Sequence, residues 1–160
     1  FMNSAYKLQL QKSASDKKKV KSKLDGLSSL SSNKVDNQLH KLHDEVFQKI
    51  DCLQCANCCK TTSPIFEQKD IDRIAKAVKM SAGSFITTYL EMDEDGDFVL
   101  QSAPCSFLNK DNTCKIYDVR PKACAEYPHT NRKRMQEILD ITYENAFVCP
   151  AVSSIVEQIK

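Results

Sequence analysis

The apolar residues ahead of the first cysteine recur at helical spacing. They fall three or four positions apart, so in a helix they would line a single face. The members of this stripe are Val35, Leu39, Leu42, Val46 and Ile50. The pattern predicts an amphipathic helix that leads directly into the cysteine-rich part of the chain.

Four later segments carry apolar residues at similar spacing. Asp70 precedes one of them and Ser81 or Ser84 opens the next, and such short polar residues favour the N-terminus of a helix. Pro150 opens the last segment, where proline suits the first helical turn. The predicted helices cover residues 70–78, 81–90, 135–142 and 150–159.

Short apolar runs between these helices predict strands at residues 98–101, 106–108 and 114–117. Residues 109–112 form a hairpin-type connection between the last two, and the acidic stretch 91–97 predicts a turn. The whole pattern predicts an α+β fold that is mostly α. We expect a small, cysteine-rich, metal-stabilised domain with a few short strands.

Charge is unevenly distributed along the chain. Residues 1–34 contain eight lysines and two aspartates, a net charge of +6, whereas the rest of the chain carries −4. Residues 13–33 are rich in Ser, Lys and Gly and hold few large apolar groups, so we expect a flexible or loosely helical arm. The predicted domains are therefore a basic, flexible N-terminal arm at 1–34 and a cysteine-cluster metal-binding domain at 35–160.

The basic arm has two interpretations. It is either a solvated tail that aids solubility or a docking segment for an acidic protein or nucleic acid. The lysines that would make such a contact are Lys17, Lys18, Lys19, Lys21 and Lys23. Their cluster contains no aromatic side chain on which a base could stack, which favours the solvated tail.

No apolar run approaches the ~18 residues of a membrane helix, so we expect no membrane span. Residues 1–12 lack the apolar stretch and small-residue cleavage site of a signal peptide. We therefore expect a cytoplasmic protein. In that compartment cysteines act more often as metal ligands than as disulfides.

Eight cysteines carry the main chemical signal. Two residues between cysteines allow a tight turn to present two sulfurs to one ion, and such pairs overlap at 52/55 and 55/58. The candidate ligands are Cys52, Cys55, Cys58, Cys59, Cys105, Cys114, Cys124 and Cys149. Disulfides, buried unreactive cysteines and a reactive thiol paired with His129 are alternatives that explain the cluster less well.

Cys58 and Cys59 are adjacent, and neighbouring side chains usually diverge. We therefore expect their sulfurs to serve two close metal centres, or one multinuclear centre, with Lys60 and Arg120 among the cations that offset thiolate charge. All-sulfur ligation suits zinc, as two ions, or alternatively iron or a 4Fe-4S cluster. The residues do not decide which downstream cysteine joins which centre.

The ordered motifs resemble one known family. Cys52–Cys59, then Pro104–Leu108, Cys114–Pro121 and Cys124–Pro128 are together similar to the YkgJ-type cysteine-cluster proteins, described as zinc- or iron-chelating domains. The resemblance covers about residues 48–150. It implies that the seven cysteines from Cys52 to Cys124 are ligands, and Cys149 matches a late cysteine seen in many members.

We expect a metal-binding protein that coordinates zinc or iron through its CxxCxxCC cluster and downstream cysteines. The alternative is an iron–sulfur oxidoreductase or an accessory protein of a methyl-transfer or modification reaction. No acid, base or nucleophile constellation is identified, so the sequence leaves open whether the protein is an enzyme.

Overall fold

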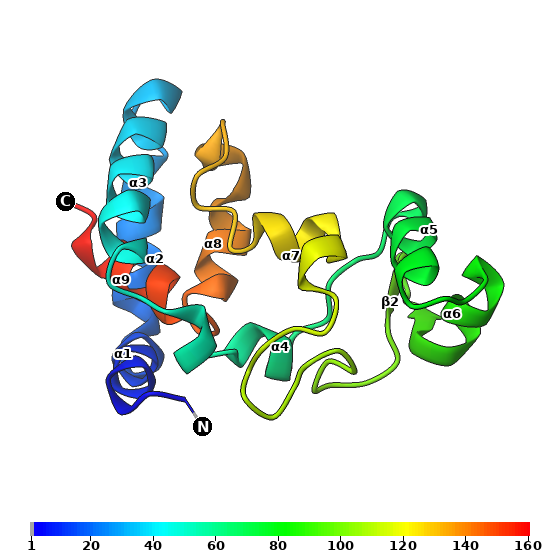
Figure 1. The fold of residues 1–160 in the computed structure, drawn as a ribbon. Coiled ribbons are helices and arrows are strands. Elements are labelled where there is room, and N and C mark those ends of the chain that lie inside the picture. The colour runs from blue at the N-terminus through cyan, green and yellow to red at the C-terminus, as the bar shows by residue number, and fades with distance from the viewer. Residues whose placement is uncertain (1) are drawn as a thin grey trace. The chain divides into compact units, whose positions relative to one another are not determined.

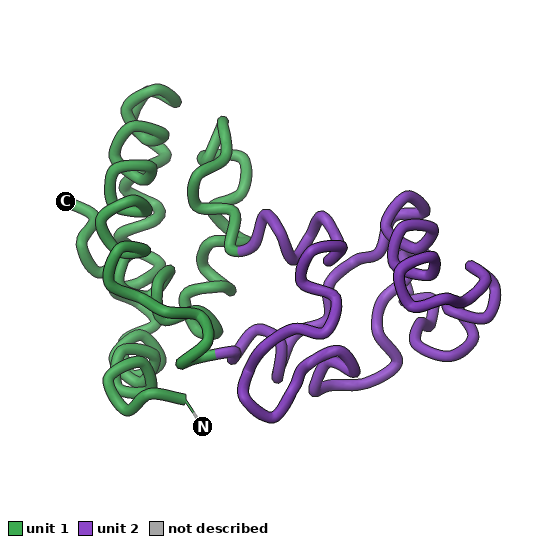
Figure 2. Tube along the Cα trace, viewed as in Figure 1, with its two compact units in different colours: residues 1–55, 128–160 green, residues 56–127 purple. Residues whose placement is uncertain are grey.

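The computed structural model describes residues 2–160, so residue 1 of the expected arm lies outside the described part. The chain divides into two compact units (Figure 2). Unit 1 combines the residues up to Cys55 with Pro128–Lys160, and unit 2 covers Ala56–Tyr127. No helix among residues 2–160 has the length and apolar character needed to cross a membrane.

Unit 1 is helical, and its helices come from both ends of the chain (Figure 1). Val35, Leu39 and Val46 are buried on one side of its long third helix, as the apolar stripe predicted. They pack with Val152 and Ile155 of the C-terminal helix in one apolar core. The elements of unit 1 are α1 (Ser4–Ser15), α2 (Lys17–Leu27), α3 (Ser32–Phe47), η1 (Cys52–Gln54), η3 (Met135–Ile138), α8 (Leu139–Asn145) and α9 (Pro150–Gln158).

The N-terminal segment, expected to be flexible or loosely helical, contains a helix with a buried face. Residues 17–27 form α2, in which Val20, Leu24 and Leu27 are buried in the core of unit 1. These residues recur every three or four positions, so they form a narrow apolar face within a lysine-rich sequence. Composition averages hide such a face because only three large apolar residues make it.

Three of the five lysines proposed for docking have partners within unit 1. Lys17 Nζ lies 5.4 Å from the centre of the Phe147 ring. Lys21 pairs with Asp25 one helical turn later. The ammonium group of Lys23 donates to the carbonyl oxygens of Glu157 and Ile159 at the end of α9, at 2.8 and 2.6 Å. A cation at a helix C-terminus satisfies carbonyls that have no helical partner. Docking of an acidic protein or nucleic acid on this segment stays a prediction.

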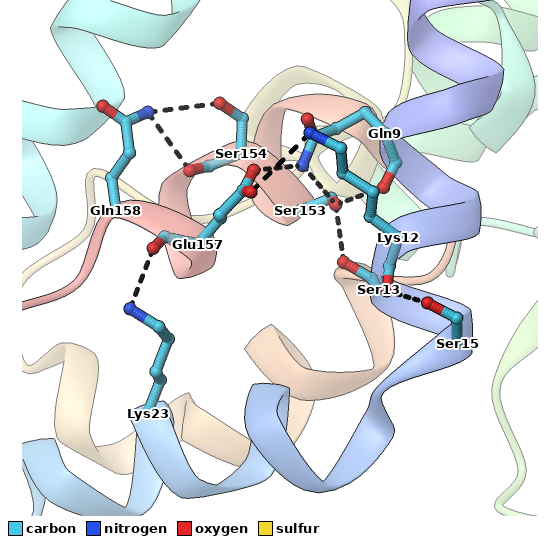
Figure 3. Close-up of polar contacts among 9 residues, drawn as sticks. All are labelled: Gln9, Lys12, Ser13, Ser15, Lys23, Ser153, Ser154, Glu157 and Gln158. Atoms are coloured by element: carbon cyan, nitrogen blue, oxygen red, sulfur yellow. Dashed lines mark hydrogen bonds and ion pairs between the residues drawn. The ribbon is translucent and has the colours of Figure 1, made fainter.

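Polar contacts attach helix α1 to α9 (Figure 3). Ser13 and Ser153 are both buried, and their hydroxyl oxygens lie 2.6 Å apart. The amide of Gln9 donates to Ser153 Oγ at 3.1 Å and to Glu157 Oε2 at 2.9 Å. Buried hydroxyls need such partners, so this network fixes one alignment of α1 along α9.

Unit 2 has shorter elements around a smaller core. Phe85 and Ile71 are fully buried there, with Phe66 and Phe107 close to fully buried. The helices at 68–77 and 82–89 confirm the two predicted from the sequence, and Ser81 caps the second. The elements of unit 2 are α4 (Asn57–Thr61), α5 (Gln68–Ala77), α6 (Ala82–Tyr89), β1 (Leu90–Met92), β2 (Phe98–Leu100), η2 (Tyr117–Val119) and α7 (Lys122–Glu126).

The sheet of unit 2 is a two-stranded antiparallel pair, with Leu90 opposite Leu100 and Met92 opposite Phe98. The strand at 98–101 was predicted. Its partner β1 was not, because Leu90 was assigned to the end of a helix and residues 91–92 to the acidic turn. The acidic stretch forms the predicted turn, in which Asp93 Oδ1 accepts the N–H groups of Asp95 and Asp97.

The predicted strands at 106–108 and 114–117 are reduced to one bridge between Leu108 and Cys114. Asn109 N–H donates to the Thr113 carbonyl at 2.8 Å and closes the turn between them. Beyond Cys114 the chain winds into η2, and the Tyr117 N–H donates to the Cys114 carbonyl at 3.3 Å instead of to a partner strand. The hairpin connection was therefore predicted, but its strands were overestimated.

Candidate metal centre

The first two cysteines lie on a tight turn of unit 1. Asp51 caps η1 by accepting the Leu53 N–H at 2.9 Å, and the Cys55 N–H donates to the Cys52 carbonyl at 3.1 Å. These bonds place Cys52 on the surface, whereas Cys55 is buried. Ala56 then adopts a left-handed backbone with φ of 49°, which redirects the chain into α4 of unit 2. The boundary between the units therefore falls inside the cysteine motif.

Cys58 and Cys59 lie in the first turn of α4, and their sulfur atoms are 4.0 Å apart. Sulfurs that share a tetrahedral zinc at about 2.3 Å lie about 3.8 Å from each other. The expected divergence of neighbouring side chains is therefore not seen. The Cys58 side chain is the main cause that lowers the pKa of Cys59 to about 7, and Lys60 acts in the same direction.

Three distant segments of unit 2 approach Cys59. The Cys105 N–H donates to the Cys59 carbonyl at 2.8 Å, and Cys114 follows on the bridge with Leu108. Burial raises the pKa of Cys105 and of Cys114, and the Cys59 thiolate adds to both shifts. The backbone contacts place Cys105 beside Cys59, and Cys114 opposite Leu108.

Cys124 belongs to the same neighbourhood. Although part of the residue is exposed, burial of its thiol raises the pKa to about 12, and the thiolates of Cys59, Cys105 and Cys114 contribute to the shift. Arg120 opposes it, as the sequence had suggested for this cation. We refer to the five thiols of unit 2, Cys58, Cys59, Cys105, Cys114 and Cys124, as the five-thiol set.

Cys149 belongs to unit 1, where it is the N-cap residue of α9. Burial raises its pKa to about 11, the nearby Cys52 and Cys55 thiolates add to this, and the backbone N–H groups of Val152 and Ala151 act in the opposite direction. We refer to the three thiols of unit 1, Cys52, Cys55 and Cys149, as the three-thiol set. It unites residues almost a hundred positions apart in sequence.

Asp70 holds the segment that carries Cys124. Its buried carboxylate accepts from Arg73 Nη2 at 2.7 Å and from the Lys122 N–H at 3.2 Å. The same Arg73 nitrogen donates to the Arg120 carbonyl at 2.9 Å. Asp70 is thus the third residue of α5 in a capping box with Glu67, rather than the helix cap itself.

The two histidines of α3 contact the segment at residues 130–132 rather than the cysteines. His40 Nε2 lies 2.7 Å from the Arg132 carbonyl, and His43 Nδ1 lies 2.7 Å from Thr130 Oγ1. Burial lowers the pKa of His43. Both residues therefore fix the 130–132 segment to α3.

The donor chemistry of both thiol sets fits a thiophilic metal, but their spacing is not that of a closed site. All eight cysteines are thiols rather than disulfides. Within residues 2–160, no three or more Cys, His, Asp or Glu side chains already surround one point at coordination distance. The thiols are gathered into two neighbourhoods that would have to tighten around a cation.

Thiols gathered in this way on a mostly helical fold are typical of cysteine-rich metal-chelating proteins. The model of the CxxCxxCC family of zinc- or iron-chelating domains matches residues 51–146, more than half of the chain. The chain belongs to this family, which confirms the resemblance drawn from its motifs. Cys149 lies just beyond the matched residues. No curated protein and no solved structure matches the chain.

Proposed function

We propose that the protein binds metal at two separate centres, one in each unit, with zinc as the preferred ion. The five-thiol set supplies the ligands of one centre, and the three-thiol set supplies ligands of the other. The proposal depends on one observation: the sulfur atoms of Cys58 and Cys59 lie 4.0 Å apart, and the Cys105 N–H donates to the Cys59 carbonyl at 2.8 Å. A bound cation would offset the like charge of thiolates held this close.

The role of metal in this proposal is structural. Residues 102–121 of unit 2 contain little regular structure beyond one bridge and one short helical turn. A thiolate-bound zinc contributes on the order of 10–16 kcal/mol of apparent folding free energy, more than a small core supplies. Metal bound to Cys105 and Cys114 would hold this segment against α4.

An iron–sulfur cluster is the second candidate for the unit 2 centre. Five gathered thiols exceed the four that a mononuclear zinc takes, and the same all-sulfur donor set suits a 4Fe-4S cluster. With such a cluster, the protein would act as an oxidoreductase or as an accessory protein of a modification reaction.

Anaerobic purification followed by elemental analysis separates these candidates. Two equivalents of zinc in a colourless protein support the first proposal, and brown protein with iron and sulfide supports the second. A single mononuclear ion per chain contradicts the two-centre arrangement. Protein without metal that also takes up no added zinc or iron contradicts both proposals.

A further inference from the structure

The turn that carries Cys52 and Cys55 is held in place by the N-terminus of α1. The Asn3 N–H donates to the Gln54 carbonyl at 2.9 Å, and the Asn3 side-chain amide donates to Gln54 Oε1 at 3.0 Å. The Asp51 N–H donates to the Tyr6 hydroxyl oxygen at 2.9 Å. Three hydrogen bonds thus connect one end of α1 to both sides of the turn.

Asn3 links this contact to the folding of α1 itself. Its side-chain oxygen caps the helix by accepting the Ala5 N–H at 2.9 Å, while its side-chain nitrogen donates to Gln54. The two halves of one amide therefore serve the helix and the turn together. If α1 frays, the turn loses both contacts with Asn3.

The body of α1 is fixed to the helix that carries the third cysteine. Figure 3 shows Gln9 and Ser13 of α1 directed toward Ser153 and Glu157 of α9. Ser153 Oγ also donates to the Gln9 carbonyl at 3.0 Å. Ser153 lies one helical turn beyond Cys149 and its N–H donates to the Cys149 carbonyl at 3.0 Å.

The two sources of thiols in unit 1 are therefore attached to the same helix. We propose that α1 is a positioning element for the three-thiol set: Asn3 and Tyr6 hold the Cys52–Cys55 turn, and Gln9 and Ser13 hold the α9 helix that begins beside Cys149. This inference rests on the proposed function. Residues that orient ligands usually change metal affinity by 10–100-fold when they are replaced.

Tyr6→Phe tests the inference because it removes only the hydroxyl that accepts the Asp51 N–H. The probe is cobalt(II), titrated anaerobically into the reduced, metal-free full chain and followed by thiolate-to-cobalt absorbance. Cys149→Ser first identifies which binding phase belongs to the three-thiol set. We expect Tyr6→Phe to weaken that phase about tenfold and to leave the other phase unchanged. Asn3→Ala removes the side-chain contact and the helix cap together, so its effect should be larger.

Tyr143→Phe is the matched control, because it removes a phenol hydroxyl from α8 of the same unit. Its cobalt affinities should equal those of the wild type. Unfolding of the metal-free protein is measured in parallel. A purely structural role would lower the stability of the metal-free and metal-loaded forms equally, with no change in affinity, and would overturn the inference.

The inference and the proposed function fail in different ways. If the wild type binds cobalt in two phases but Tyr6→Phe and Asn3→Ala leave both affinities unchanged, α1 is not a positioning element. If Cys149→Ser binds cobalt in the same two phases as the wild type, the three-thiol centre itself is wrong. The inference about α1 then fails as well.

Discussion

Unit 1 and unit 2 both gather thiols, but they support them in different ways. Unit 1 places Cys149 at the start of a helix whose Val152 and Ile155 lie in a large apolar core. Unit 2 places Cys105 and Cys114 on a segment with little regular structure, beside a smaller core. We therefore expect unit 1 to fold before metal binds, and we expect the cysteine segment of unit 2 to need metal to hold its place.

Removal of metal should have the largest effect and should separate the two units. With a chelator under reducing conditions, we expect amide protection at residues 102–126 to collapse, a loss of up to about 10 kcal/mol of local stability. Amides of α3 and α9 should keep most of their protection. Hydrogen exchange measured by mass spectrometry checks both, and equal loss in α3 would contradict the difference between the units.

Leu39→Ala should have the next largest effect, a loss of stability in unit 1. Leu39 is fully buried in the core of unit 1, so truncation should lower the free energy of unfolding by about 2–5 kcal/mol. Leu8→Ala, at a side chain that is 56% exposed, should cost little. Denaturant unfolding gives the values. If the folded Leu39→Ala variant binds less metal than the wild type, metal binding by the thiols depends directly on this core.

Asp70→Asn should weaken unit 2 by a smaller amount. The substitution removes the charge that pairs with Arg73 and accepts the Lys122 N–H, so we expect a cost of about 1–3 kcal/mol. Amide hydrogen exchange should increase more near Cys124 than elsewhere in the chain. Asp72→Asn on the exposed side of the same helix is the control and should change neither stability nor exchange. Equal effects of the two variants would exclude Asp70 as the support of α7.

The smallest expected effect is a pH dependence of unit 1. Burial lowers the pKa of His43, so the unfolded chain takes up this proton more readily than the folded one. The contribution of His43 to stability is present above the ordinary pKa of about 6.5 and is lost as pH falls through the lowered value. Unfolding measured from pH 8 to pH 5 should show a weaker slope in His43→Asn than in the wild type. An unchanged slope would remove His43 as its source.

The sequence predicted the helices best where apolar spacing was long and regular. The stripe from Val35 to Val46 is such a case, and the final helix after Pro150 is another. Helix α2 was predicted only as a flexible or loosely helical segment because Val20, Leu24 and Leu27 stand among lysines. Strand β1 was missed because Leu90 continues the apolar pattern of α6. In both cases packing within the unit decided what local composition left open.

The cysteine motif indicated metal chemistry, but it did not show which cysteines belong to the five-thiol set and which to the three-thiol set. The division depends on backbone contacts that join distant segments, such as the hydrogen bond from Cys105 to Cys59. The contacts of Asn3 and Tyr6 with the 51–55 turn gave no sequence signal either, since neither residue belongs to a motif. Such pairings arise only when the chain folds.

Native mass spectrometry of two variants tests the central claim most directly. The double variant Cys58→Ser/Cys59→Ser leaves three thiols in unit 2, one fewer than a mononuclear zinc takes, and Cys149→Ser leaves two in unit 1. If the thiols form two independent centres, each variant should lose one metal centre and keep the mass of the other. Loss of all metal from either variant, or full retention in both, would contradict the division into a five-thiol and a three-thiol set.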